Sequence, residues 1–175
     1  MKPGAALIHK VGLLLVLCAM FLSPGLSHAE QAVAAGQSSG ELEVGHGEAR
    51  KPNQLAVFAG ITGESRRDYA PTLALEYVRH VNESFAVAAV AEYAFGDLDY
   101  FIFVVPFAWV NDSLKVFAGP GFEVEEKGET KLLLRAGFEY GFELNEHWEL
   151  APQFNVDFVD GEYATVIGIS VGRGF

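Results

Sequence analysis

From Gln54 to the C-terminus, large apolar residues alternate with small or polar ones, and no stretch keeps the 3.6-residue period of an amphipathic helix. The alternation is clearest from Leu132 to Leu144, where one parity carries Leu, Ala, Phe and Tyr while the other carries mainly Arg, Gly and Glu. The segment from Tyr100 to Val110 is apolar at both parities, so the pattern leaves its two faces unassigned. Such alternation predicts antiparallel β-strands with two distinct faces.

A short polar turn recurs about every 30 residues and divides this region into hairpins. It reads Val81-Asn82-Glu83-Ser84, then Val110-Asn111-Asp112-Ser113, then Leu144-Asn145-Glu146-His147. Each repeat therefore contains two strands of about ten residues, a turn and a loop. We expect four hairpins, and so an all-β, eight-stranded antiparallel up-and-down β-barrel.

The composition of the two faces indicates which one points into the barrel. The polar parity is mostly Gly and Ala with scattered acids, which suits the crowded interior of a narrow eight-stranded barrel. Strands of ten or eleven residues tilted by roughly 40° span about 25 to 28 Å, the height of an apolar band in a membrane. We therefore expect a transmembrane barrel with its apolar face in lipid. The alternative is a soluble, lipocalin-like binding barrel with the opposite orientation.

The N-terminus has the pattern of a secretory signal. Lys2 and Lys10 precede an apolar run over residues 11–22, and a breaker at Pro24-Gly25 leads to a small-x-small site ending at Ala29. Residues 30–53 are rich in Gly, Ala, Ser, Glu and Gln, which is typical of disorder. We predict a signal peptide over 1–29 cleaved after Ala29, a disordered leader over 30–53 and a barrel domain over 54–175.

Charge and cysteine content narrow the possible partners. The formal net charge of -11 and pI of about 4.8 argue against nucleic acid, which requires clustered Lys and Arg. The lone cysteine, Cys18, lies inside the signal, so the exported chain has no disulfide or thiolate metal site. We predict no cofactor.

The C-terminus carries the most specific resemblance. Phe175 ends the chain after Val171 and Ile169 on one parity, and glycines and Ser170 fill the other. With its signal and strand pattern, the chain resembles the small eight-stranded outer-membrane β-barrels of Gram-negative bacteria, the group that includes OmpA and OmpX. The resemblance implies a place in the outer membrane, contact with its lipid and lipopolysaccharide, and Phe175, Val171 and Ile169 as a signal for the barrel assembly machinery. Arg173 departs from the usual apolar pattern.

Enzymes are known on this scaffold, so we looked for their residues. The His-x-Ser pair of the lipid A deacylases is absent, since His80 and His147 lie at turns without a serine two residues away on a strand. We predict a non-enzymatic protein with an envelope-structural or surface-interaction role. A narrow pore or carrier for small solutes is the alternative role for a membrane barrel.

Interior charges are the remaining candidates for function. Hairpin register predicts that Arg135 faces Asp157 on one side and Glu123, opposite or diagonal, on the other, with Glu139 in the same network. Such a network either compensates buried charge or acts as a gate on a water path.

In the loops opposite the turns, charged residues suggest contacts with lipopolysaccharide. Asp97 and Asp99, with Asp160, are candidates for holding a divalent cation that bridges to its phosphates. Arg66 and Arg67 are candidates for direct contact with lipid phosphates.

Overall fold

The computed structural model describes residues 51–64, 68–96, 98–125 and 128–175. In these residues all regular structure is β-strand. The strands are β1 (Asn53–Glu64), β2 (Asp68–His80), β3 (Phe85–Ala94), β4 (Tyr100–Val104), β5 (Phe107–Asn111), β6 (Leu114–Glu125), β7 (Thr130–Tyr140), β8 (Phe142–Glu143), β9 (Trp148–Val159) and β10 (Glu162–Gly174).

These ten segments make eight barrel strands, because two of the strands are interrupted without losing register. β4 and β5 both pair with β3 and β6 at one common register, and the break falls at Pro106, which has no N–H to give to a neighbour. Pro106 still accepts a hydrogen bond from the N–H of Ala88. β7 and β8 likewise share one register on β9, with Gly141 between them. The predicted eight-stranded antiparallel barrel is confirmed.

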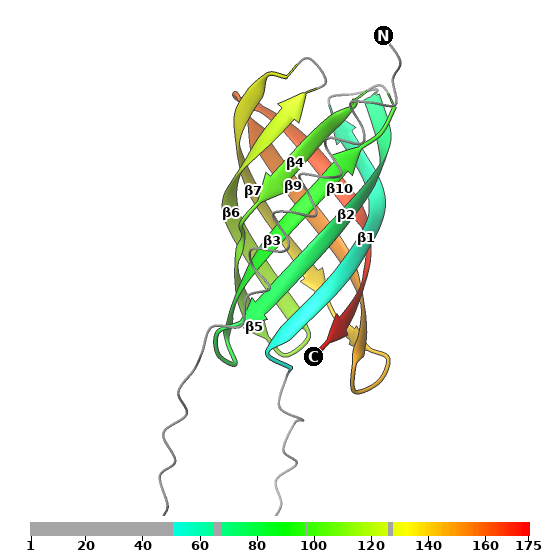
Figure 1. Cartoon of the computed structure of the whole chain (residues 1–175), viewed down its shortest axis with the longest axis vertical. Helices are drawn as coiled ribbons and strands as arrows, with labels where there is room; N and C mark the ends of the chain where they lie inside the picture. Colours follow the sequence, from blue (N-terminus) through cyan, green and yellow to red (C-terminus); the bar gives the residue numbers. More distant parts are fainter. Residues whose placement is uncertain (1–50, 65–67, 97, 126–127) are drawn as a thin grey trace, which may run out of the picture. The chain divides into compact units, whose positions relative to one another are not determined.

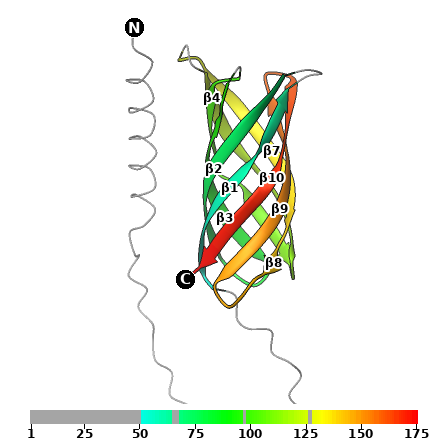
Figure 2. The same ribbon diagram turned by 90° about the vertical axis from the view of Figure 1, so that its right-hand side faces the viewer.

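The barrel closes between its first and last strands, so every strand has two neighbours. Figure 2 shows β10 lying between β1 and β9, and both pairings are antiparallel. Strand partners followed once around the barrel from Asn53 lead back to Gly63, ten residues further along β1. With eight strands this stagger corresponds to a tilt of about 40°. Figure 1 shows the strands running at a slant around the barrel.

The two parities face as predicted, with apolar side chains outside and polar or small ones inside. The outer surface includes Leu73, Phe107 and Ile167, each at least half exposed, whereas Arg135 and Asp157 are almost completely buried. In the segment whose faces were left unassigned, Tyr100, Ile102 and Val104 point inward, and Phe107 and Trp109 point outward. An outer surface of this kind excludes the soluble barrel of opposite orientation and requires lipid around it.

An asparagine side chain stabilises two of the recurrent turns. The side-chain oxygen of Asn82 accepts hydrogen bonds from the N–H groups of Ser84 and Phe85, and Asn145 does the same for His147 and Trp148. The turn at Asn111 is tighter and has Asp112 at a φ of 48°. We name the end of the barrel with these three turns, Asn53 and Phe175 the turn end, and the opposite end the loop end.

The predicted signal peptide with its cleavage site at Ala29, and the leader up to residue 50, lie outside the described residues. The described chain begins at Lys51 and β1 at Asn53, next to the predicted domain boundary at residue 54. A search of the described part of the chain for a helix long and apolar enough to cross a membrane finds none.

Candidate functional site

Arg135 organises the charged centre of the barrel interior. From β7, its Nε and Nη2 donate to the two carboxylate oxygens of Asp157 on β9, both at 2.7 Å. Its Nη1 and Nη2 also donate to Glu92 on β3, at 2.7 and 3.0 Å. The side chain of Arg135 is only 2% exposed, so one guanidinium joins two carboxylates by four charge-assisted bonds in a water-poor space.

A second ion cluster lies around Lys115 on β6. Lys115 Nζ is 2.7 Å from a carboxylate oxygen of Glu139 and 2.7 Å from one of Glu149. Glu149 also accepts a hydrogen bond from Gln54 at 3.1 Å. This cluster provides a second interior cation, so Glu139 and Glu149 are paired with a base.

An amide relay extends the Lys115 cluster further into the barrel. Gln153 Nε2 donates to Glu139 at 3.0 Å and to Glu76 at 3.3 Å. Because that nitrogen faces two acceptors, the oxygen of Gln153 is left to accept from Asn155 Nδ2 at 3.2 Å. Asn155 Oδ1 has no hydrogen-bond partner among the described residues.

Side chains fill almost all of the space between these groups. Polar groups from both ion clusters border a cavity of only about 30 Å³, room for a single water molecule. The loop-end half of the interior also contains an apolar cluster that includes the fully buried Ile102, Leu133 and Val166. The ring of Phe58 lies where side chains at Gly60 and Gly168 would otherwise project. The described interior is therefore packed as a core.

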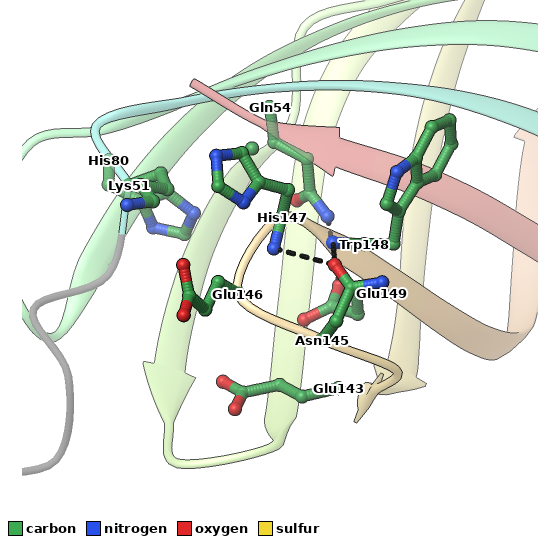
Figure 3. A pocket seen from close by; sticks show the side chains of 10 residues that line it. Lys51, Gln54, His80, Glu143, Asn145, Glu146, His147, Trp148 and Glu149 are labelled. Carbon is green, nitrogen blue, oxygen red and sulfur yellow. Dashed lines mark hydrogen bonds between the residues drawn. The ribbon is translucent and has the colours of Figure 1, made fainter.

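A larger cavity of about 320 Å³ opens at the turn end. Figure 3 shows its lining, which combines bases and acids with Trp148. The 144–147 turn forms part of the wall and is held by the bond from the N–H of His147 to Asn145 Oδ1, at 3.0 Å. Glu149 and Gln54 close its inner end, where the Lys115 cluster begins. The residues that line it are Lys51, Gln54, His80, Glu143, Asn145, Glu146, His147, Trp148, Glu149 and Gly174.

The predicted interior network separates into two clusters. Arg135 lies opposite Asp157 as the hairpin register predicts. The expected contact of Arg135 with Glu123 is wrong, because Gly119 stands opposite Arg135 and Glu123 stands opposite Lys131. The β6–β7 loop is tighter than assumed, since the N–H of Glu125 already bonds to the carbonyl of Glu129. Glu139 belongs to the Lys115 cluster instead.

The sequence did not indicate Glu92 as the second partner of Arg135. Glu92 has inward parity on β3, but β3 and β7 are not neighbours, so no hairpin register links them. Lys115 also has inward parity. The β6–β7 register places it opposite Glu139, and this register could have predicted their ion pair.

The other predicted residues are placed as follows. Ile169, Val171 and Phe175 are exposed on the outer face of the last strand and at its end. Asp99 accepts a hydrogen bond from the hydroxyl of Tyr93. Asp97, Arg66 and Arg67 lie outside the described residues, and no group of three His, Cys, Asp or Glu in the described part could hold a metal ion.

Comparison with known proteins points to one type of fold. No protein-family model matches the chain, and no curated protein matches it either. The N-terminal β-barrel domain of OprF from Pseudomonas aeruginosa is similar in structure, with a TM-score of 0.53 and 11% sequence identity over 72% of this chain and 100% of that one. The chain has the fold of the small outer-membrane β-barrels.

Two further solved structures of this kind are less similar. Ail of Yersinia pestis has a TM-score of 0.48 and 12% identity over 73% of this chain and 100% of its own. OprG of Pseudomonas aeruginosa has a TM-score of 0.46 and 12% identity over 72% of this chain and 98% of its own. At such identities the likeness concerns the fold, and the apolar outer surface independently identifies this outer-membrane-type barrel as a membrane protein.

Proposed function

We propose that the protein is a closed, non-catalytic β-barrel of the outer membrane that acts through its lipid-facing surface and its loops, in an envelope-structural or surface-interaction role. One observation carries this proposal: the guanidinium of Arg135 donates four hydrogen bonds to Glu92 and Asp157 across an interior filled with side chains. A closed interior leaves the outer surface and the two rims as the places where partners bind.

The proposed partners are outer-membrane lipid and lipopolysaccharide, and the barrel assembly machinery during insertion. A surface of Leu, Ile, Val and aromatic side chains supports contact with acyl chains. Exposed Ile169, Val171 and Phe175 at the last strand support recognition during assembly.

Single-channel recording in planar bilayers tests this function against its main alternative. The mature chain, folded in detergent and shown to be folded by its heat-modifiable gel mobility, is expected to give no steady currents. The Arg135→Ala variant is expected to be less stable and still non-conducting, because the apolar cluster around Ile102, Leu133 and Val166 remains packed in the loop-end half of the barrel. Regular current steps from the wild-type protein would contradict the closed scaffold.

A narrow pore for small cations is the second candidate, and the chain of polar side chains favours it. Glu149, Lys115, Glu139, Gln153 and Glu76 lead from the turn-end cavity into the interior. Currents that appear only when the Arg135 or Lys115 pairs are removed would support a gated pore.

Cell fractionation tests the location. Recovery with outer membranes, requiring detergent for release, is expected. Recovery in the periplasmic supernatant would contradict both candidate functions.

A further inference from the structure

The lipid-facing surface is uncharged except at two positions. Within the described strands, outward parity carries a charged residue only at Arg79 on β2 and Arg173 on β10, and both side chains are exposed. The acids among the described residues have inward parity or lie in turns, loops and rims. Neither arginine forms an ion pair with another described residue.

The register places these two arginines on either side of the same strand. Arg79 pairs with Asn53, and Arg173 pairs with Leu55, two residues further along β1. At a tilt of about 40°, moving two residues along a strand changes the height along the barrel axis by about 5 Å. Stepping sideways to a neighbouring strand changes that height by about 3 Å. The step to β2 leads toward the loop end and the step to β10 leads away from it. The Cα atoms of Arg79 and Arg173 therefore lie at almost the same depth, about 12 Å apart, within the combined reach of the two side chains.

An ordered aromatic ring fills the surface between them. Tyr77 has the same outward parity as Arg79 and pairs with Leu55, so it lies between the two arginines and slightly deeper in the membrane. Its hydroxyl donates to Asn53 Oδ1 at 2.9 Å, which directs the ring toward the turn end. Trp148 pairs with Arg173, is 43% exposed and marks the interface beside it.

Together these groups match the parts of an anionic phospholipid. Two arginines whose Cα atoms lie at one depth suit a phosphate or a phosphatidylglycerol-type headgroup. Leu55 and the Tyr77 ring present an apolar surface to the first carbons of its chains. We propose that Arg79 and Arg173, with Tyr77 between them, form a binding site for an anionic phospholipid in the leaflet at the turn end. In the outer-membrane placement proposed above, on which this inference rests, that leaflet is the periplasmic one.

Quenching of Trp148 by brominated lipid tests the proposal. The two tryptophans are Trp109 and Trp148, so the Trp109→Phe variant leaves Trp148 as the sole reporter at the site. The mature chain is folded into vesicles of phosphatidylcholine that contain a fixed fraction of either brominated phosphatidylglycerol or brominated phosphatidylcholine. We expect phosphatidylglycerol to be preferred beside Trp148 by roughly 10- to 30-fold, since each arginine near an anionic surface contributes about a factor of five.

Matched variants separate the site from general charge effects. Replacing both arginines, Arg79→Gln with Arg173→Gln, is expected to abolish the preference. Lys131→Gln, which removes a cation at the loop end, is expected to leave it unchanged. A preference that survives in the double variant, or is absent from the parent, would overturn the proposal.

Two further controls identify the source of a negative result. Millimolar inorganic phosphate is expected to leave the quenching unchanged, and displacement of the lipid by phosphate would show a site for free anions instead. A chain that inserts and shows heat-modifiable mobility, but has no lipid preference, refutes only this site. A chain that fails to insert into vesicles refutes the proposed membrane function.

Discussion

Arg135 makes one contact with a neighbouring strand and one contact that spans the barrel. Its pairing with Asp157 follows from a hairpin between neighbouring strands, and a hairpin register depends on a few turn residues. Its pairing with Glu92 spans the barrel and depends on the stagger accumulated over several hairpins. The prediction for Glu123 was wrong for a similar reason, because it depended on the register of a single hairpin. The loop between β6 and β7 closes more tightly than its sequence suggests, which shifts that register.

Loss of Arg135 should destabilise the barrel strongly. Arg135→Ala leaves Glu92 and Asp157 buried and unpaired, so we expect the free energy of unfolding to fall by roughly 3–5 kcal/mol. Urea-dependent loss of heat-modifiable mobility in vesicles measures the change. The control is Lys131→Ala, whose ion pair with Glu125 has side chains 32% exposed and contributes much less. Equal effects of the two substitutions would contradict a structural role for the Arg135 cluster.

Two glycines on the last strand should respond differently to a methyl group. A methyl at Gly168 would overlap the backbone oxygen of Ala59 and the ring of Phe58, neither of which is free to move, so Gly168→Ala should cost about 1–3 kcal/mol. A methyl at Gly172 meets the end of the Gln54 side chain, which can move at the cost of its hydrogen bond to Glu149, so Gly172→Ala should cost less than Gly168→Ala. Thermal unfolding of both variants in one detergent compares them, and a Gly172→Ala loss as large as that of Gly168→Ala would contradict this packing.

At the scale of the strand, alternation was sufficient to predict the two faces. It failed only from Tyr100 to Val110, where the inward Tyr100, Ile102 and Val104 are as apolar as the outward residues. Those inward side chains pack in the apolar cluster that contains Phe58. Because this part of the interior is apolar, the alternation of polar and apolar residues cannot reveal it. A strand that is apolar on both faces is ambiguous because the interior here is partly a hydrophobic core and partly an ion network.

A charge on the lipid face should be costly in proportion to its depth. Ile167 is 59% exposed near the middle of β10, and Ile167→Arg should lower the free energy of unfolding in vesicles by about 2–4 kcal/mol. Tyr163 has the same outward parity near the loop end of that strand, and Tyr163→Arg should cost roughly 0–1 kcal/mol. Denaturant titration in phosphatidylcholine vesicles measures both. If the two costs were equal, β10 would not cross a hydrocarbon layer.

At the scale of the whole molecule, the strand number and class could be predicted, whereas the stagger could not. Counting hairpins requires only the recurrent turns, but a stagger of ten residues is the sum of every register, so one misjudged loop changes it. The turn-end cavity depends on that sum as well, because residues from both ends of the barrel domain, such as Lys51 and Gly174, line it.

The last residue of the chain should matter more for assembly in cells than for stability. The backbone of Phe175 exchanges two hydrogen bonds with Asn53, and these remain when the exposed side chain is removed. Phe175→Ala is therefore expected to fold into vesicles like the parent, while the amount of folded barrel in the outer membrane falls several-fold. Phe158→Ala removes an equally exposed aromatic and should leave that amount unchanged. A parallel fall in both variants would argue against a terminal recognition signal.

The pairing of β1 with β10 means that β1 gains its second neighbour only after β10, the last strand of the barrel, has been synthesised. Until then β1 presents a row of unsatisfied N–H and C=O groups, which hydrocarbon does not tolerate. The barrel hence cannot enter the bilayer one hairpin at a time from the N-terminus. Either the barrel closes as it inserts, or a strand of another protein pairs with the open edge of β1 until β10 arrives.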